Sequence, residues 1–114
     1  MKKLRVPLRV VFYRDGSDWV AHGLEFDLLG DGVTREQALA RLAEAVSIQV
    51  ETSLEHDNPD NLFSPADGKY FRMFAAGEDV AVGVLHIESG SVVIDAETRE
   101  YSESDADLVT LQAS

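Results

Sequence analysis

The sequence predicts a single α+β domain in which a sheet is covered by one long helix, and three observations support this prediction. Apolar and polar residues alternate over residues 4–12, which is typical of a strand with one buried face. A capped, amphipathic stretch follows at residues 35–55, which is typical of a helix packed on a sheet. Two further apolar segments, at residues 80–87 and 91–94, predict a C-terminal hairpin.

Size and charge restrict the class of protein. A chain of 114 residues with 45% apolar residues can bury about 65% of its unfolded surface, so one ordinary core is expected. The absence of cysteine excludes disulfides and thiolate metal sites. The net charge of −11 disfavours binding to phosphate backbones and favours basic protein partners. No run approaches a signal-peptide core or a membrane span. We therefore expect a cytoplasmic domain with no direct nucleic-acid or membrane binding.

Three strands are predicted before the long helix. The first strand ends at a turn over residues 14–17, because Asp-Gly is a strong hairpin signal. Pro7 has no backbone N–H, so this strand either lies at an edge there or begins its pairing after Pro7. Residues 19–24 form the second predicted strand, and Leu28 and Leu29 form the core of a short third one.

The long helix has a clear start. Gly30-Asp31-Gly32 is expected to end the third strand, and Thr34 is the predicted N-cap. Gln37 lies three residues later, where its side chain can reach back to the N–H of Thr34 in a capping box. The helix is predicted over residues 35–55, and one apolar stripe marks its buried face: Leu39, Leu42, Val46, Val50 and Leu54.

The second half of the chain begins with a helix-breaking turn at residues 56–61. Ser64 and Pro65 predict the N-cap and first position of a short helix at residues 65–75, and Gly77 suits its end. This helix and the hairpin form a predicted extension of the core, which spans residues 4–55.

The extension covers residues 62–95, and an acidic tail is predicted at residues 96–114. Leu108, Val109 and Leu111 in this tail either add one more strand or fray. The hairpin can complete its own sheet or pair with the edge of a second subunit.

Two runs resemble the N-terminal domain of HicB-type antitoxins. They are Phe12-Tyr13-Arg14-Asp15-Gly16-Ser17-Asp18-Trp19-Val20-Ala21 and Gly32-Val33-Thr34-Arg35-Glu36-Gln37-Ala38-Leu39. The resemblance covers about residues 8–55. It implies a β-β-β-α, partial ribonuclease-H-like sheet without the active site of that enzyme. It also implies oligomerisation and the masking of a small basic toxin ribonuclease.

The chain departs from this family in two places. Leu24-Glu25-Phe26-Asp27 stands where the family often has a proline-rich stretch. Family antitoxins usually end in a DNA-binding segment, whereas Arg99 is the only basic residue over residues 77–114 here. The sequence therefore looks like an orphan HicB-like protein that lacks the DNA-binding C-terminus.

The strongest cluster of chemically capable residues lies around the third strand. Carboxylates with one imidazole can hold a divalent cation, although acidic residues are also ordinary turn formers. His56 is placed at a helix C-terminus, and His86 is expected on the face of the hairpin that carries Val84 and Glu88. No histidine has an obvious nucleophile and orienting partner. The cluster consists of His22, Glu25, Asp27 and Asp31.

These observations favour a non-catalytic protein-interaction module with no cofactor and no resident metal. We expect a homo-oligomer, with a dimer favoured, that masks a small basic partner. The alternatives are a small metal-dependent hydrolase on a ribonuclease-H-like sheet and an orphan structural homo-oligomer. The resemblance places the interface near the sheet, at Trp19, His22, Glu25 and Asp27.

Overall fold

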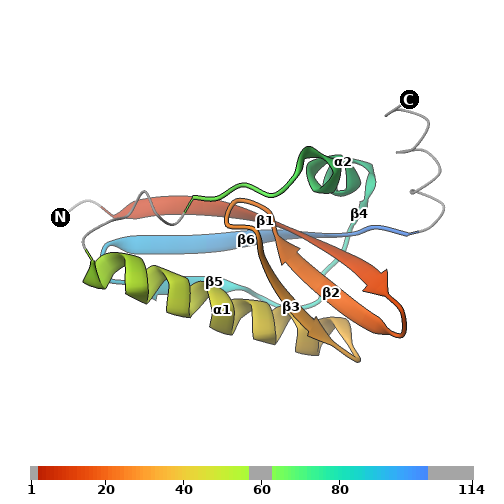
Figure 1. The fold of residues 1–114 in the computed structure, drawn as a ribbon, viewed down its shortest axis with the longest axis horizontal. Helices are drawn as coiled ribbons and strands as arrows, with labels where there is room; N and C mark the ends of the chain where they lie inside the picture. Colours follow the sequence, from red (N-terminus) through yellow and green to blue (C-terminus); the bar gives the residue numbers. More distant parts are fainter. Residues whose placement is uncertain (1–2, 57–62, 103–114) are drawn as a thin grey trace.

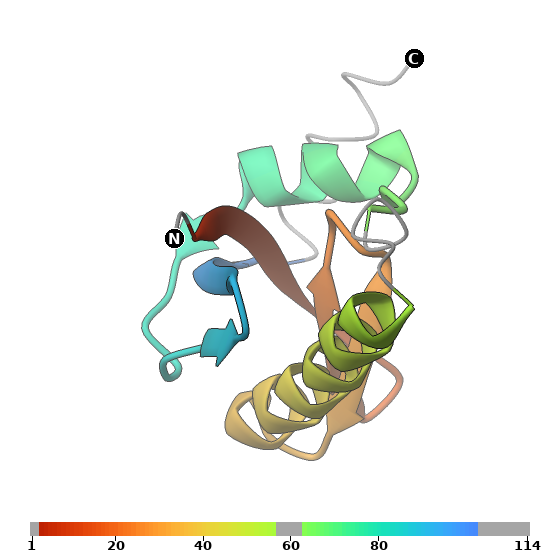
Figure 2. The same ribbon diagram turned by 90° about the vertical axis from the view of Figure 1, so that its left-hand side faces the viewer.

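The computed structural model describes residues 3–56 and 63–102. Its centre is one mixed six-stranded sheet in the order β3-β2-β1-β6-β4, with β5 paired to β6. A long helix, α1, lies on one side of this sheet and a short helix, α2, lies on the other, as Figures 1 and 2 show from two directions. The α+β architecture predicted from the sequence is therefore confirmed. Within the described residues, no helix is both long and apolar enough to cross a membrane.

The N-terminal strands form the predicted meander. They are β1 (Leu4–Asp15), β2 (Asp18–Gly23) and β3 (Leu28–Gly32), and both neighbouring pairs are antiparallel. Gly16, at the tip of the first hairpin, has a φ of 63°, a conformation that glycine adopts without steric cost. At Pro7, β1 pairs only with β6, because its pairing with β2 begins at Val10. Pro7 therefore lies where one side of β1 is an edge, which is one of the two arrangements expected from the missing N–H.

The long helix α1 (Arg35–Glu55) has the predicted bounds. The Gln37 backbone N–H donates to Oγ1 of Thr34 at 3.1 Å, so Thr34 is the N-cap. The second half of the predicted capping box is wrong in one detail. Oε1 of Gln37 accepts from the N–H of Val33 at 2.8 Å, one residue earlier than expected. The side chain still satisfies a backbone donor before the helix.

The C-terminal strands join the same sheet. They are β4 (Glu78–Asp79), β5 (His86–Ser89) and β6 (Val92–Glu100). Of the strand predicted at residues 80–87, only the end is observed, in β5. The strand predicted at residues 91–94 is longer than expected, because β6 continues to Glu100. The reason is that β6 pairs in parallel with β1 from Leu4 to Phe12, which keeps it extended through Glu100. The predicted hairpin, now β5 and β6, thus joins the sheet of its own chain through the pairing of β6 with β1.

Two further predictions fall partly or wholly outside the described residues. The turn at residues 56–61 is described only at His56, which is the C-cap of α1 and directs Nδ1 toward the Thr52 carbonyl at 2.8 Å. The proposed strand at Leu108, Val109 and Leu111 lies entirely outside. The first residues of the predicted acidic tail, 96–100, belong to β6.

The short helix α2 spans Gly68–Ala76, so the predicted start at Pro65 is wrong. The backbone N–H groups of Ser64 and Ala66 donate to the carbonyls of Glu25 and Leu24, at 3.1 and 2.8 Å. These hydrogen bonds hold residues 64–66 in an extended conformation against the β2–β3 turn. The helix therefore begins three residues later than predicted, at Gly68. Gly77 ends the helix as predicted.

Each face of the sheet has its own core. On the α1 side, alternate residues of β1 pack against the buried stripe of the helix. On the α2 side, a smaller cluster contains Val11, Leu24, Ala66 and Phe74. Because helices cover both faces, Val10, Val11 and Phe12 are all fully buried in succession. The alternation in the sequence had predicted one buried face for this strand.

His86 lies on β5 and shares a face with Glu88, as predicted, but Val84 precedes the strand. Its Nδ1 is 2.5 Å from Oδ1 of Asp95 on β6. The hydrogen bond with the Asp95 carboxylate raises the pKa of the His86 imidazole above its ordinary value.

The backbone of β3 comes close to the backbone of α1 at Gly30. A Cβ placed there would lie 2.3 Å from the Ala38 carbonyl oxygen and 2.3 Å from the Leu42 nitrogen. Both atoms belong to the α1 backbone, so they cannot move aside as a flexible side chain would. Gly30 therefore sets the distance at which α1 packs on the edge of the sheet.

Gly30→Ala is expected to destabilise the protein by about 2–3 kcal/mol, because the added methyl overpacks a rigid contact. Gly83→Ala is the matched control, since its Cβ would meet only the Leu39 Cδ2 atom at 3.5 Å. Urea unfolding measures both variants. Equal stability of the two variants would contradict the close approach.

Candidate functional site

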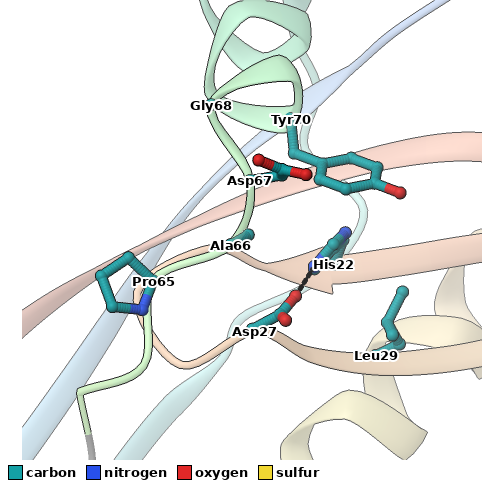
Figure 3. A pocket seen from close by; sticks show the side chains of 8 residues that line it. All are labelled: His22, Asp27, Leu29, Pro65, Ala66, Asp67, Gly68 and Tyr70. Carbon is teal, nitrogen blue, oxygen red and sulfur yellow. Dashed lines mark hydrogen bonds and ion pairs between the residues drawn. The ribbon is translucent and has the colours of Figure 1, made fainter.

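A pocket opens on the α2 side of the sheet, between the β2–β3 turn and the start of α2. Its volume is about 610 Å³. Figure 3 shows residues from three parts of the chain converging on it. We call it the His22 pocket, and its lining is His22, Asp27, Leu29, Pro65, Ala66, Asp67, Gly68 and Tyr70.

His22 is the buried polar residue at the base of this pocket. It lies on β2 and is 2% exposed. Its Nε2 is 2.7 Å from Oδ1 of Asp27, and its Nδ1 is 3.2 Å from the Tyr13 hydroxyl. A carboxylate can only accept, so we assign the proton to Nε2. In this tautomer Nδ1 accepts from the Tyr13 hydroxyl.

Two tyrosines hold the imidazole in place. The Tyr70 ring centroid lies 4.5 Å from that of His22, and the Tyr13 and Tyr70 rings stack at 5.9 Å. Burial, reinforced by the nearby Tyr70, Asp15 and Asp27, raises the pKa of the Tyr13 phenol above its ordinary value. The Tyr13 phenol therefore keeps its proton throughout the neutral range.

Asp27 stands at the mouth of the pocket. Its φ is 51°, in the left-handed region that aspartate and asparagine tolerate better than most residues. Its side chain is 49% exposed although one oxygen is bonded to His22. The turn that carries it is fixed from behind, because the Glu25 carboxylate accepts from both the backbone N–H and the Nε of Arg9, each at 2.7 Å. The result is an outward-facing carboxylate with a defined orientation.

The histidine and the carboxylate differ in solvent exposure from their counterparts in a catalytic triad. In a triad the histidine faces the nucleophile and substrate, while the carboxylate is buried behind it. Here His22 is buried and Asp27 faces the pocket. The hydroxyl hydrogen-bonded to the imidazole belongs to Tyr13, whose raised pKa disfavours the phenolate nucleophile. The arrangement fixes the orientation of the Asp27 carboxylate at the mouth of the pocket.

The structure separates the four residues considered as metal ligands. Only His22 and Asp27 meet. Glu25 is engaged by Arg9, and Asp31 lies beside Arg41, whose Nη1 is 3.6 Å from Oδ1 and 3.0 Å from the backbone oxygen of Asp31. Over residues 3–56 and 63–102, no group of three or more His, Asp or Glu side chains is placed to hold a metal ion.

The four predicted interface residues also divide. His22 and Asp27 line the pocket, and Glu25 supports the adjacent turn. Trp19 packs with the core on the α1 side of the sheet and has Arg14 and Arg35 against its ring. It therefore lies on the face of the sheet opposite His22.

Asp67 and Tyr70 of the pocket lining, and Tyr13, which contacts His22, were not identified as site residues from the sequence. Asp67 and Tyr70 belong to the start of α2, more than 40 residues after His22 in the chain. Tyr13 shows a partial signal, since it lies on a strand that pairs with β2 across a two-residue turn. Its contact with His22 follows from that pairing.

Asp27→Ala is expected to lower the free energy of unfolding by about 1–3 kcal/mol, because it leaves the buried Nε2–H of His22 without an acceptor. Asp27→Asn retains an oxygen for this bond and tolerates the positive φ, so its loss is expected to stay below about 1 kcal/mol. Urea unfolding of both variants measures the difference. Equal losses would contradict the role given to this bond.

Neither the protein-family models, nor the curated proteins, nor the solved structures gave a match.

Proposed function

We propose that this chain is a non-catalytic, HicB-like protein-interaction module that binds a small basic protein. The net charge of −11 and the resemblance of residues 8–55 to HicB-type antitoxins support the proposal. The β-β-β-α order of the first half agrees with what that resemblance implies. We further propose a cytoplasmic location, which agrees with the absence of cysteine.

The observation that carries the proposal is the chemistry of the His22 pocket. Asp27 and Asp67 present two carboxylates at its mouth, and Tyr70 presents an aromatic ring. Asp67 is the N-cap of α2, yet its side chain makes no capping hydrogen bond. Carboxylates beside an aromatic ring suit an arginine or lysine side chain. The Lys69 Nζ already lies 4.9 Å from the Tyr70 ring centroid, an internal example of such a contact.

An anion is the less favourable occupant. The N-terminus of α2 has a partial positive charge of about one half, which by itself favours an anion. Two full carboxylates at the same mouth outweigh it. A basic side chain from the partner protein is therefore the better match for the pocket.

The described C-terminal segment agrees with a role without direct DNA binding. Residues 77–102 contain β4, β5 and β6, with Arg99 as the only lysine or arginine. The Arg99 guanidinium is engaged by Asp79, by Glu97 and by the Phe74 carbonyl. These contacts leave this segment without a basic surface for a phosphate backbone.

A pull-down from the source lysate tests the proposal. Wild-type protein is expected to retain a small basic companion that elutes as salt is raised, because ion pairs at the pocket are screened. The Asp27→Asn/Asp67→Asn variant is expected to retain at least about tenfold less of it. Quantitative mass spectrometry of the eluates measures the difference.

The matched control carries the same change of charge elsewhere. Glu78→Gln/Glu97→Gln removes two exposed carboxylates from β4 and β6, and it should retain the companion. If wild type retains no basic companion, or if both double variants lose it equally, the pocket is not the binding site.

The edge of the sheet favours a second candidate function, that of a homodimer. Within the described residues β3 pairs only with β2, so its outer edge is open. Leu29 on this edge is 52% exposed, and Val33 just beyond it is 69% exposed. Arg41 donates to the Asp31 carbonyl and covers one end of the edge. An open edge beside exposed apolar side chains is a common site of strand pairing between subunits.

Sedimentation is expected to show a species of twice 12.5 kDa that Leu29→Lys converts to a monomer, because the added charge opposes edge pairing. Val84→Lys adds the same charge at an exposed position away from β3 and should remain a dimer. A 12.5 kDa species from the wild type at micromolar concentration would exclude this candidate.

A further inference from the structure

The outer face of α1 carries two adjoining hollows. One, of about 190 Å³, lies between the helix and residues 82–84. The other, of about 440 Å³, continues along the helix over Ser47 and Ile48. Ala43 lines both. We call this continuous surface the helix-side groove.

The groove is apolar along its length. Val84 is 90% exposed and Ile48 is 64% exposed, so both large side chains lie uncovered within the part of the chain that the structure describes. Between them the floor consists of the small residues Ala40, Ala43 and Ser47. Small residues with a large apolar side chain on each side form a surface into which another side-chain ridge can pack.

The rim of the groove is acidic. Glu36, Glu44 and Glu51 line it, and all three are exposed. None of them forms an ion pair or side-chain hydrogen bond with any other described residue. Neither hollow is lined by a lysine or an arginine. The groove thus presents uncompensated negative charge beside exposed apolar surface.

We propose that the helix-side groove binds an amphipathic helix from a basic protein. The apolar ridge of the bound helix lies over Ala43 between Val84 and Ile48. The lysines or arginines of the bound helix form ion pairs with Glu36, Glu44 and Glu51. The distance along α1 from Glu36 to Glu51 is about 22 Å, which matches a helix of about fifteen residues. An apolar ridge flanked by basic residues supplies both kinds of contact that the groove offers.

Charge decides between this occupant and two others. A second copy of α1 would bring two sets of three glutamates together with no cation between them, which is repulsive. An anionic lipid surface would be repelled by the same carboxylates. A basic helix converts this charge into ion pairs.

This surface is separate from the His22 pocket. Figure 2 shows α1 and α2 on opposite sides of the sheet. The groove is lined by residues of α1 and residues 82–84, whereas the pocket is lined by residues of β2, the β2–β3 turn, β3 and the start of α2. The inference therefore does not depend on the function proposed above, and each can fail alone.

A synthetic amphipathic peptide tests the proposal. The probe is a fluorescein-labelled helix of about fifteen residues with a leucine ridge and flanking lysines. Fluorescence anisotropy is expected to show binding that weakens with salt. Circular dichroism is expected to show a gain of helix in the complex. Val84→Asp and Ile48→Asp are each expected to weaken binding by about tenfold, because both are exposed and line the groove.

The controls distinguish binding in the groove from non-specific electrostatic binding of a basic peptide to an acidic protein. A scrambled peptide of identical composition has the same charge without the ridge and should bind at least about tenfold more weakly. Val33→Asp places a charge at an exposed apolar residue outside the groove and should bind like the wild type. The Asp27→Asn/Asp67→Asn variant should also bind like the wild type.

Three outcomes would overturn the proposal. They are equal binding of the scrambled peptide, unchanged binding by both groove variants, and the absence of binding at low salt. A dimer of the wild type that dissociates on Ile48→Asp would assign the groove to a second copy of the chain and overturn it as well. Loss of binding only in the Asp27→Asn/Asp67→Asn variant would locate the peptide in the His22 pocket.

Discussion

The whole structure depends on the burial of β1 on both of its faces. This strand bonds to β2 on one edge and to β6 on the other, and helices cover it above and below. Val10, Val11 and Phe12 are fully buried because each face is closed by a different part of the chain. The α1 side is closed by sequence neighbours, whereas the α2 side is closed by residues that follow much later. The His22 pocket lies at the border of this second, smaller core.

The sequence predicted those elements that are determined locally. Thr34 and Gln37 mark the start of α1 by their own hydrogen bonds, and the apolar stripe of the helix needs no distant partner to be recognised. The predictions for β6 and α2 failed at their ends because both are set by long-range pairing. Pairing with β1 extends β6 to Glu100. Hydrogen bonds from Ser64 and Ala66 to the β2–β3 turn shift the start of α2 to Gly68.

The candidate site shows the same division. The sequence grouped His22 and Asp27 as an imidazole and a carboxylate around the third strand, and in the structure Nε2 of His22 lies 2.7 Å from Oδ1 of Asp27. The grouping with Glu25 and Asp31 was wrong because nearby arginines, Arg9 and Arg41, engage those carboxylates instead. No periodic pattern in the sequence predicts that Asp67 or Tyr70 lies near His22. Their position follows from how α2 lies across the sheet.

The parallel ladder between β1 and β6 has a consequence for how the chain reaches this state. Its first pair joins Leu4 to Val92, so the centre of the sheet is completed by residues from opposite ends of the described chain. Closing such a large loop is entropically costly, and contacts of this kind slow folding. During synthesis β1, β2, β3 and α1 emerge together while one edge of β1 still lacks its neighbour. The second edge of β1 is therefore covered only after β6 has emerged from the ribosome, and until then it is open to pairing with other chains.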